Sequence, residues 1–163
     1  MKLAHHTLIS VMLSPLVYLF SRSLTAARAC FGAGILIDIY HFFEFFYKFG
    51  FRRISLKRFF RAAENHEYDR FFLLFHSYEL ALILWLIAIF LIRKPWAWGF
   101  ALGFTVHIIA DQIYNPCHPL TYLLLYRIKN RFVGDRLFPP KIQERYKEKR
   151  KGWGNKNPNA GPP

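Results

Sequence analysis

Four apolar runs, all within the first 114 residues, constrain the fold of this chain more than any other feature of its sequence. A membrane-spanning helix needs about 20 mostly apolar residues. Four segments approach this requirement: Leu3–Phe20, Ala29–Gly50, Phe71–Ile92 and Pro95–Tyr114. If all four were core helices of a soluble protein, the 163-residue chain would have too little polar surface to cover them. We therefore expect an all-α fold, built as a four-helix transmembrane bundle.

The composition of the chain argues against a disordered protein and against a soluble nucleic-acid-binding protein. Lys and Arg number 23 against 10 Asp and Glu, yet 53% of the residues are hydrophobic and 19% are aromatic. Disordered chains combine high charge with few aromatic residues. The sequence contains no basic motif interleaved with aromatic residues, which would predict specific nucleic-acid binding. The two cysteines have no CxxC spacing and give no disulfide framework.

The distribution of basic residues predicts the orientation of the spans. With four spans, the N-terminus, the loop between the second and third spans and the C-terminal tail share one side, which holds 19 of the 23 Lys and Arg residues. Cytoplasmic loops carry an excess of Lys and Arg, so we expect a multi-pass protein of the inner (plasma) membrane with both termini cytoplasmic. The alternative is a signal peptide cleaved after Ala29, but Arg28 fits such a site poorly and we favour a retained helix.

Three regions follow from this pattern. Residues 1–115 form the four-span domain, residues 116–151 form a basic segment, and residues 152–163 form a disordered tail rich in Gly, Pro and Asn. Within the basic segment, Leu120–Arg131 is predicted to be a short amphipathic helix at the membrane interface. Its basic residues would face anionic headgroups, so membrane lipids are the predicted partners. We expect no specific binding of nucleic acid. The sequence does not predict the oligomeric state.

Ionisable residues inside the predicted spans point to a functional site. They comprise four of the ten acids and five of the seven histidines: Asp38, Glu44, Glu79, Asp111, His5, His6, His41, His76 and His107. Such residues are costly in a membrane and usually mark a function. Simple salt bridges to Lys or Arg do not account for these residues, because Lys48 is the only Lys or Arg inside the predicted spans that might pair with them.

The spacing of these residues predicts that they converge. The second, third and fourth spans each carry a histidine three or four residues from a carboxylate, which places both on one helix face. The pairs are Asp38 with His41, His76 with Glu79, and His107 with Asp111. At a rise of about 1.5 Å per residue, all these groups lie about 5–18 Å from the cytoplasmic helix ends, although helix direction alternates.

Histidine and carboxylate ligands together suit a divalent transition metal such as zinc, iron or manganese, and spacing does not choose among them. The predicted metal ligands are His6, Asp38, His41, His76, His107 and Asp111, with His5 as the alternative to His6. Three or four ligands suffice for one catalytic zinc with a water, whereas a larger set leaves room for two ions. Glu79 is the predicted catalytic proton carrier, because it follows His76 by three residues.

Three ordered motifs carry most of these residues. They are Gly34-Ile-Leu-Ile-Asp38-Ile-Tyr-His41, Arg70 followed by His76-Ser77, and Gly103-Phe-Thr-Val-His107-Ile-Ile-Ala-Asp111. With them, residues 1–115 resemble the bacterial LexA-regulated, membrane-bound metal-dependent hydrolase family. The resemblance implies a small multi-span protein with a metal site, for which we expect one or two ions, zinc first among them. The chain departs from the family at Tyr40, where the family has a second aspartate that Glu44 or Glu79 could replace.

The predicted function is that of an integral membrane metal-dependent hydrolase acting on a lipid or phosphoester at the cytoplasmic membrane edge, through a metal-activated water. One alternative is a transporter of metal ions or protons, because Asp, Glu and His also form relays. Another is a noncatalytic membrane protein whose helices are stapled by a metal. The one-sided depth of the polar groups favours the enzyme, since a conduit needs polar groups on both sides of the midplane.

Overall fold

The computed structural model describes residues 3–39, 75–115, 117–144 and 148 of the chain. These residues form helices and no strand, which confirms the all-α prediction for the described part. In chain order the elements are α1 (Leu3–Ser21), α2 (Leu24–Leu36), the 3₁₀ helix η1 (Ile37–Ile39), α5 (Tyr78–Leu86), the π-helix η3 (Ile87–Ile92), α6 (Pro95–Tyr114), the 3₁₀ helix η4 (Pro119–Tyr122), α7 (Leu124–Lys129) and α8 (Gly134–Leu137). They fall into two compact units, one with residues 3–39, 75–115 and 122–124 and one with residues 117–121, 125–144 and 148.

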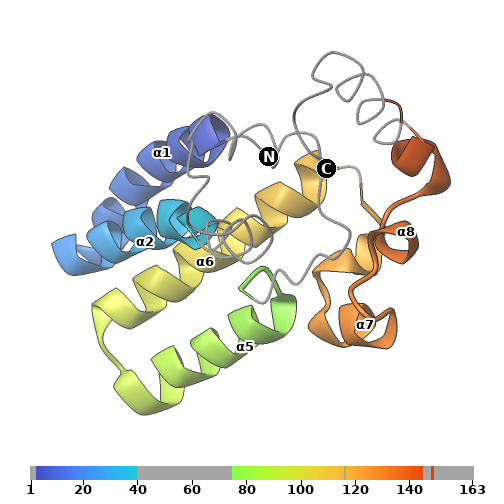
Figure 1. The fold of residues 1–163 in the computed structure, drawn as a ribbon. Helices are drawn as coiled ribbons and strands as arrows, with labels where there is room; N and C mark the ends of the chain where they lie inside the picture. The colour runs from blue at the N-terminus through green and yellow to red at the C-terminus, as the bar shows by residue number, and fades with distance from the viewer. Residues whose placement is uncertain (1–2, 40–74, 116, 145–147, 149–163) are drawn as a thin grey trace, which may run out of the picture. The chain divides into compact units, whose positions relative to one another are not determined.

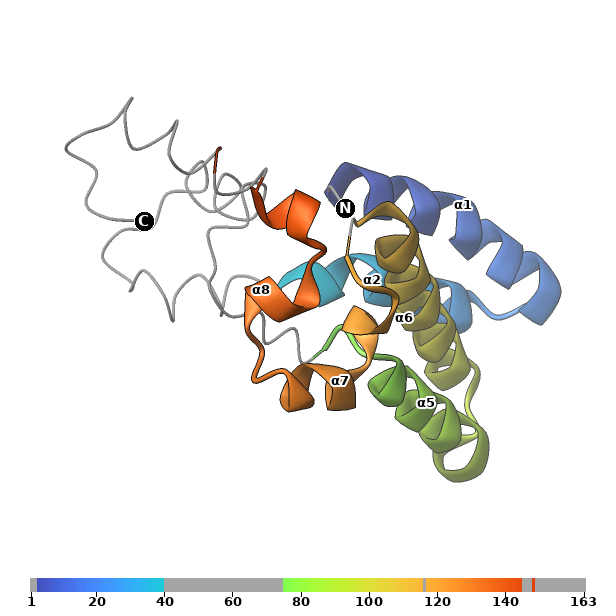
Figure 2. The same cartoon turned by 90° about the vertical axis from the view of Figure 1, so that its right-hand side faces the viewer.

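The first unit is built from α1, α2, α5 and α6 (Figure 1). α2 packs against both α1 and α6, and α5 packs against α6. Figure 2 shows the same helices after a 90° turn, with α6 again between α5 and the α1–α2 pair. The buried side chains of this unit are mostly small, and small residues let helix backbones approach closely. They include Ala26, Ala33, Ala97, Ala101 and Gly103.

Two short turns connect the helices of the first unit, and each contains an arginine in the left-handed backbone conformation. Arg22 has φ 53° and ends α1, and the hydroxyl of Ser23 then accepts the Ala26 amide hydrogen at the start of α2. Arg93 also has φ 53° and ends η3. Pro95 follows at the first position of α6, where the missing N–H of proline costs nothing.

The predicted spans agree with the helices to different degrees. Leu3–Phe20 corresponds to α1, and Pro95–Tyr114 has the same bounds as α6. The helix in the second predicted span starts earlier than predicted, at Leu24 instead of Ala29, because Ser23 caps α2. The remainder of that span, including His41, Glu44 and Lys48, lies outside the described residues.

The helix of the third predicted span, Phe71–Ile92, begins at Tyr78. The hydroxyl of Ser77 accepts the amide hydrogen of Leu80, which makes Ser77 the N-cap. His76 therefore precedes the helix, and the expectation that His76 and Glu79 share one helix face is wrong. Beyond Leu86 the apolar segment continues as the π-helix η3.

Among the described residues, one helix is both long and apolar enough to cross a membrane, over Ala4–Ser21. The segments Leu24–Leu36 and Tyr78–Ile92 are apolar but shorter. α6 has 20 residues, but His107, Asp111 and Gln112 reduce its apolar character.

The second unit contains most of the predicted interfacial segment. In place of one helix over Leu120–Arg131, the chain forms η4 and α7, and the carbonyl of Leu137 accepts hydrogen bonds from the His118 amide and the Thr121 hydroxyl. Arg127 is fully buried, and the contact of the basic residues of this segment with lipid headgroups stays a prediction. The exposed face of α7 instead carries Leu125 and Ile128. The predicted disordered tail, residues 152–163, lies outside the described residues.

Candidate metal centre

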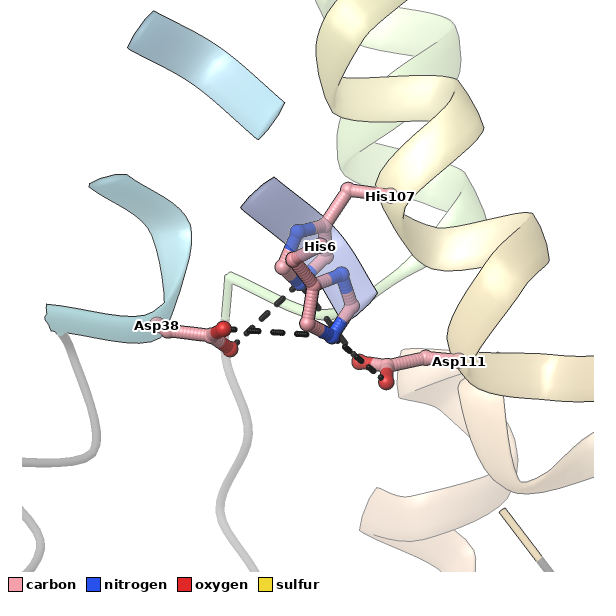
Figure 3. Close-up of side chains that lie close together, drawn as sticks. All are labelled: His6, Asp38, His107 and Asp111. Carbon is pink, nitrogen blue, oxygen red and sulfur yellow. Dashed lines mark ion pairs between the residues drawn. The ribbon is translucent and has the colours of Figure 1, made fainter. Parts of the chain in front are cut away.

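Five polar side chains meet at one end of the α1, α2 and α6 helices in the first unit. His6 comes from α1, Asp38 from η1, His76 from the turn before α5, and His107 and Asp111 from α6. Figure 3 shows four of them, and one ligand atom from each of these four lies within 4.8 Å of the others. The list is His6, Asp38, His107 and Asp111. His76 adjoins both carboxylates of this group.

The distances from His76 and His107 to the two carboxylates match those between ligands of one metal ion, whereas His6 lies 3.8 Å from Asp38 and 3.2 Å from Asp111. The Nε2 atom of His107 lies 3.5 Å from Asp38 Oδ1 and 3.5 Å from Asp111 Oδ2. The Nε2 atom of His76 lies 3.6 Å from the same two oxygens. Direct N–H···O hydrogen bonds are shorter, at about 2.7–3.2 Å. A tetrahedral metal with bonds of about 2.0–2.2 Å holds its ligand atoms about 3.3–3.6 Å apart.

A hydrogen bond from the other nitrogen of the His107 ring determines which nitrogen faces the two carboxylates. The Nδ1 atom of His107 lies 2.8 Å from the carbonyl oxygen of Gly34. A carbonyl only accepts, so Nδ1 carries the ring hydrogen and, in the neutral ring, Nε2 presents a lone pair. That lone pair faces two carboxylates, and this buried atom has no hydrogen-bond partner in the described part of the chain. Either a proton on Nε2, which makes ion pairs with the two carboxylates, or a metal cation between them relieves this repulsion. Metal-bound histidines commonly donate their other N–H in this way.

The three imidazole rings are packed closely around this point. The rings of His6 and His107 stack with centroids 3.8 Å apart and planes 14° apart. His76 meets His107 edge-on, with centroids 5.3 Å apart. The Nε2 atom of His6 also lies 3.2 Å from Asp111 Oδ1. Two positively charged rings stacked at this distance would repel each other, so neutral ligand rings fit the geometry better than a pair of imidazolium ions.

Asp111 is held in position by a residue that the sequence analysis missed. The side-chain amide of Asn115 donates to Asp111 Oδ1 at 3.1 Å and to the hydroxyl of Tyr122 at 2.8 Å. This leaves Oδ2 of Asp111 directed at His76 and His107. The signal was present in the sequence, since Asn115 follows Asp111 by four residues and so shares its helix face.

Burial shows from which side the cluster is reached. The side chains of His6, His76, His107 and Asp111 are at most 5% exposed, whereas that of Asp38 is 20% exposed. Water is therefore largely excluded from the imidazole side, and Asp38 is the member of the cluster most accessible to solvent.

Two other predicted residues, His5 and Glu79, are described by the structure and lie outside the cluster. His5 is exposed and stacks on Tyr114 with ring centroids 6.0 Å apart, so His6 is the histidine that enters the cluster. Glu79 is not a member of the group, and its Oε2 atom accepts the Leu124 amide hydrogen at 2.8 Å. The argument from a shared helix face no longer supports Glu79 as proton carrier, and that role stays a prediction. His41 lies outside the described residues.

Comparison of the chain with protein-family models, with curated proteins and with solved structures finds no match. The resemblance to metal-dependent hydrolases therefore rests on the three motifs alone. What the geometry supports by itself is coarser: the cluster of His6, Asp38, His107 and Asp111 could hold a metal ion, although its members also form ion pairs with one another.

Proposed function

We propose that this chain is an integral membrane hydrolase that uses a divalent transition metal to cleave a lipid or a phosphoester at the cytoplasmic membrane edge. The observation that carries the proposal is the position of His107 Nε2, which is buried and 3.5 Å from an oxygen of each of two carboxylates while Nδ1 is engaged by a backbone carbonyl. Neutral histidines and carboxylates at these distances form the ligand set of a catalytic metal.

The proposed ligands come from His6, Asp38, His107 and Asp111, whose ligand atoms lie within 4.8 Å of one another, and from His76, which adjoins both carboxylates. Zinc is the metal we propose, because mixed nitrogen and oxygen ligands at tetrahedral spacing suit it. When bound in such a site, a divalent metal lowers the pKa of a water molecule and polarises the oxygen of a substrate.

The residues of the chain have three tasks in this proposal. The Gly34 carbonyl fixes the His107 ring so that Nε2 points inward, and Asn115 fixes Asp111 so that Oδ2 does the same. Burial of the three imidazoles keeps bulk water away from one side of the site. The partly exposed Asp38 lies where substrate and water would enter. Glu79 remains the proposed proton carrier.

The outer surface of the first unit supports a position in the membrane. Large apolar side chains are exposed on all four of its main helices, and exposed apolar surface of this extent marks contact with lipid or another apolar partner. They include Met12, Phe20, Leu24, Phe31, Leu82, Phe90, Leu91, Trp96 and Ile113. The ionisable groups of the cluster point inward instead, as expected for polar groups within a membrane protein. We propose four spans with both termini in the cytoplasm, the tail contacting anionic lipid headgroups.

The activity is tested with the full chain purified in detergent, stripped of metal and reloaded with zinc. We expect zinc-dependent release of product from a mixed phospholipid extract or from a chromogenic phosphoester, and no release by the His76→Ala variant. If the protein in proteoliposomes transports metal ions or protons but hydrolyses no substrate, the enzyme hypothesis is refuted in favour of the transporter. Bound metal with neither hydrolysis nor flux would leave a metal that only staples the helices.

A further inference from the structure

The helices α2 and α6 meet along a seam in which paired residues keep one constant register. The seam has four levels, and each level lies four residues after the previous one on both helices. In order the first three pairs are Ala26 with Gly99, Cys30 with Gly103, and Gly34 with His107. At the fourth level, Asp38, which lies in η1 directly after α2, and Asp111 both adjoin His107 Nε2. Because the numbers rise together, the two helices run in the same direction, and the seam leads into the candidate metal centre.

The first two levels are backbone contacts that require glycine. A Cβ atom at Gly99 would overlap the carbonyl oxygen of Ala26, and one at Gly103 would overlap the carbonyl oxygen of Cys30. The atoms in the way are backbone atoms, which cannot rotate aside as the end of a side chain can. Glycine thus lets the backbones of the two helices approach closely at these two levels.

This close approach continues into the next two levels. One turn beyond Gly103, the carbonyl of Gly34 lies 2.8 Å from the His107 ring, a contact that fails if the helices move apart. One turn further, an oxygen of Asp38 and an oxygen of Asp111 lie at equal distances of 3.5 Å from His107 Nε2.

Gly34 sets the third helix in the same way. A Cβ atom at Gly34 would overlap the hydroxyl of Ser10, which is buried on α1. Ser10 follows His6 by four residues and so shares its face of α1. The missing side chain at Gly34 therefore lets α1 bring His6 onto the His107 ring, at the centroid distance of 3.8 Å.

We propose that Gly34, Gly99 and Gly103 are positioning residues of the metal centre, which set the spacing of α1, α2 and α6 without touching the metal. This inference rests on the proposed metal site. The chain offers a matched control in Gly32, which also lies in α2, because a Cβ atom there would meet only the end of the Leu36 side chain, at an ordinary 3.8 Å.

The test measures Co²⁺ binding to the full chain in detergent, by affinity and by the visible absorption of the bound ion. Second-layer changes at metal sites typically lower affinity by about 10–100-fold. We expect a loss in this range and an altered spectrum for Gly103→Ala and Gly34→Ala, a smaller loss for Gly99→Ala, and wild-type binding for Gly32→Ala. A purely structural role predicts a lower melting temperature with unchanged affinity and spectrum in the folded protein, and that result would overturn the inference.

A rescue experiment keeps the test decisive if Gly103→Ala does not fold. Replacing Ser10 by glycine removes both atoms that a Cβ at position 34 would meet, so Gly34→Ala combined with Ser10→Gly should bind Co²⁺ more tightly than Gly34→Ala alone. A double variant no better than Gly34→Ala would contradict the positioning role. If the wild-type protein itself binds no Co²⁺, the proposed metal site is refuted. If the wild type binds Co²⁺ and the glycine variants bind it equally well, only the positioning role is refuted.

Discussion

The Nδ1 atom of His107 lies 2.8 Å from the carbonyl oxygen of Gly34, a residue 73 positions earlier in the chain. This contact joins two helices and also fixes which nitrogen of the ring carries hydrogen. It directs the lone pair of Nε2 at Asp38 and Asp111. The backbone of a neighbouring helix therefore orients the ring as the proposed metal site needs it.

Replacing Asn115 tests whether its hydrogen bond to Asp111 orients that carboxylate for metal binding. Asn115→Ala removes the donor to Asp111 Oδ1, so the carboxylate can rotate away from His76 and His107. We expect metal affinity to fall by about 10–100-fold, as for other groups that orient metal ligands. The measurement is a competition titration with a metal-binding dye.

Ile113→Ala is the matched control for Asn115→Ala, because Ile113 lies in the last turn of α6, two residues before the C-cap Asn115, and is 72% exposed. Its affinity for metal should equal that of the wild type. Equal affinity in the Asn115→Ala protein would show that Asp111 is held without the asparagine.

Glu79→Gln separates proton transfer from structural support. The amide keeps one oxygen to accept the Leu124 amide hydrogen, so we expect the melting temperature and metal content to hold. If Glu79 carries a proton, phosphoester turnover should fall by about 10²–10⁴-fold. Turnover and metal content are measured on the same preparation.

Two other outcomes for Glu79→Gln each assign a different role. Unchanged turnover with unchanged metal would restrict Glu79 to supporting the start of α7. Loss of metal would make Glu79 a ligand, against its present contact with Leu124.

The proposed topology predicts which cysteine substitutions react from outside the cell. In a protein with Cys30→Ala and Cys117→Ser, Lys94→Cys lies in the turn before α6 and Glu144→Cys lies in the C-terminal region. A membrane-impermeant maleimide should label Lys94→Cys in intact cells and Glu144→Cys only after permeabilisation. The reverse pattern would refute the orientation, and labelling of both in intact cells would refute cytoplasmic termini.

Helix periodicity predicted the elements where local signals were strong. α6 has the predicted bounds because Pro95 starts it and Pro116 follows soon after its end at Tyr114. The third helix was placed too early, because the apolar run before His76 outweighed the capping signal of Ser77. His76 still reaches the cluster, through a turn instead of a helix face.

The members of the cluster and the support of Asp111 by Asn115 were accessible to sequence reasoning, whereas the support of His107 by Gly34 was not. A histidine and a carboxylate four residues apart indicate one helix face, and His107 and Asp111 do share a site. Spacing within one helix does not show which carbonyl of another helix lies opposite. The contact between Gly34 and His107 depends on the α2–α6 seam, which only the packed structure shows.

The most direct test of the account is the metal content of the detergent-purified protein, measured by elemental analysis for the wild type, His107→Ala and His5→Ala. The exposed His5 is the control, because it lies outside the cluster. We predict about one or two divalent transition-metal ions per chain in the wild type and in His5→Ala, and a strong loss in a monodisperse His107→Ala protein. A wild-type protein that stays metal-free after loading with zinc, or a His107→Ala protein that keeps the full content, would contradict the metal centre.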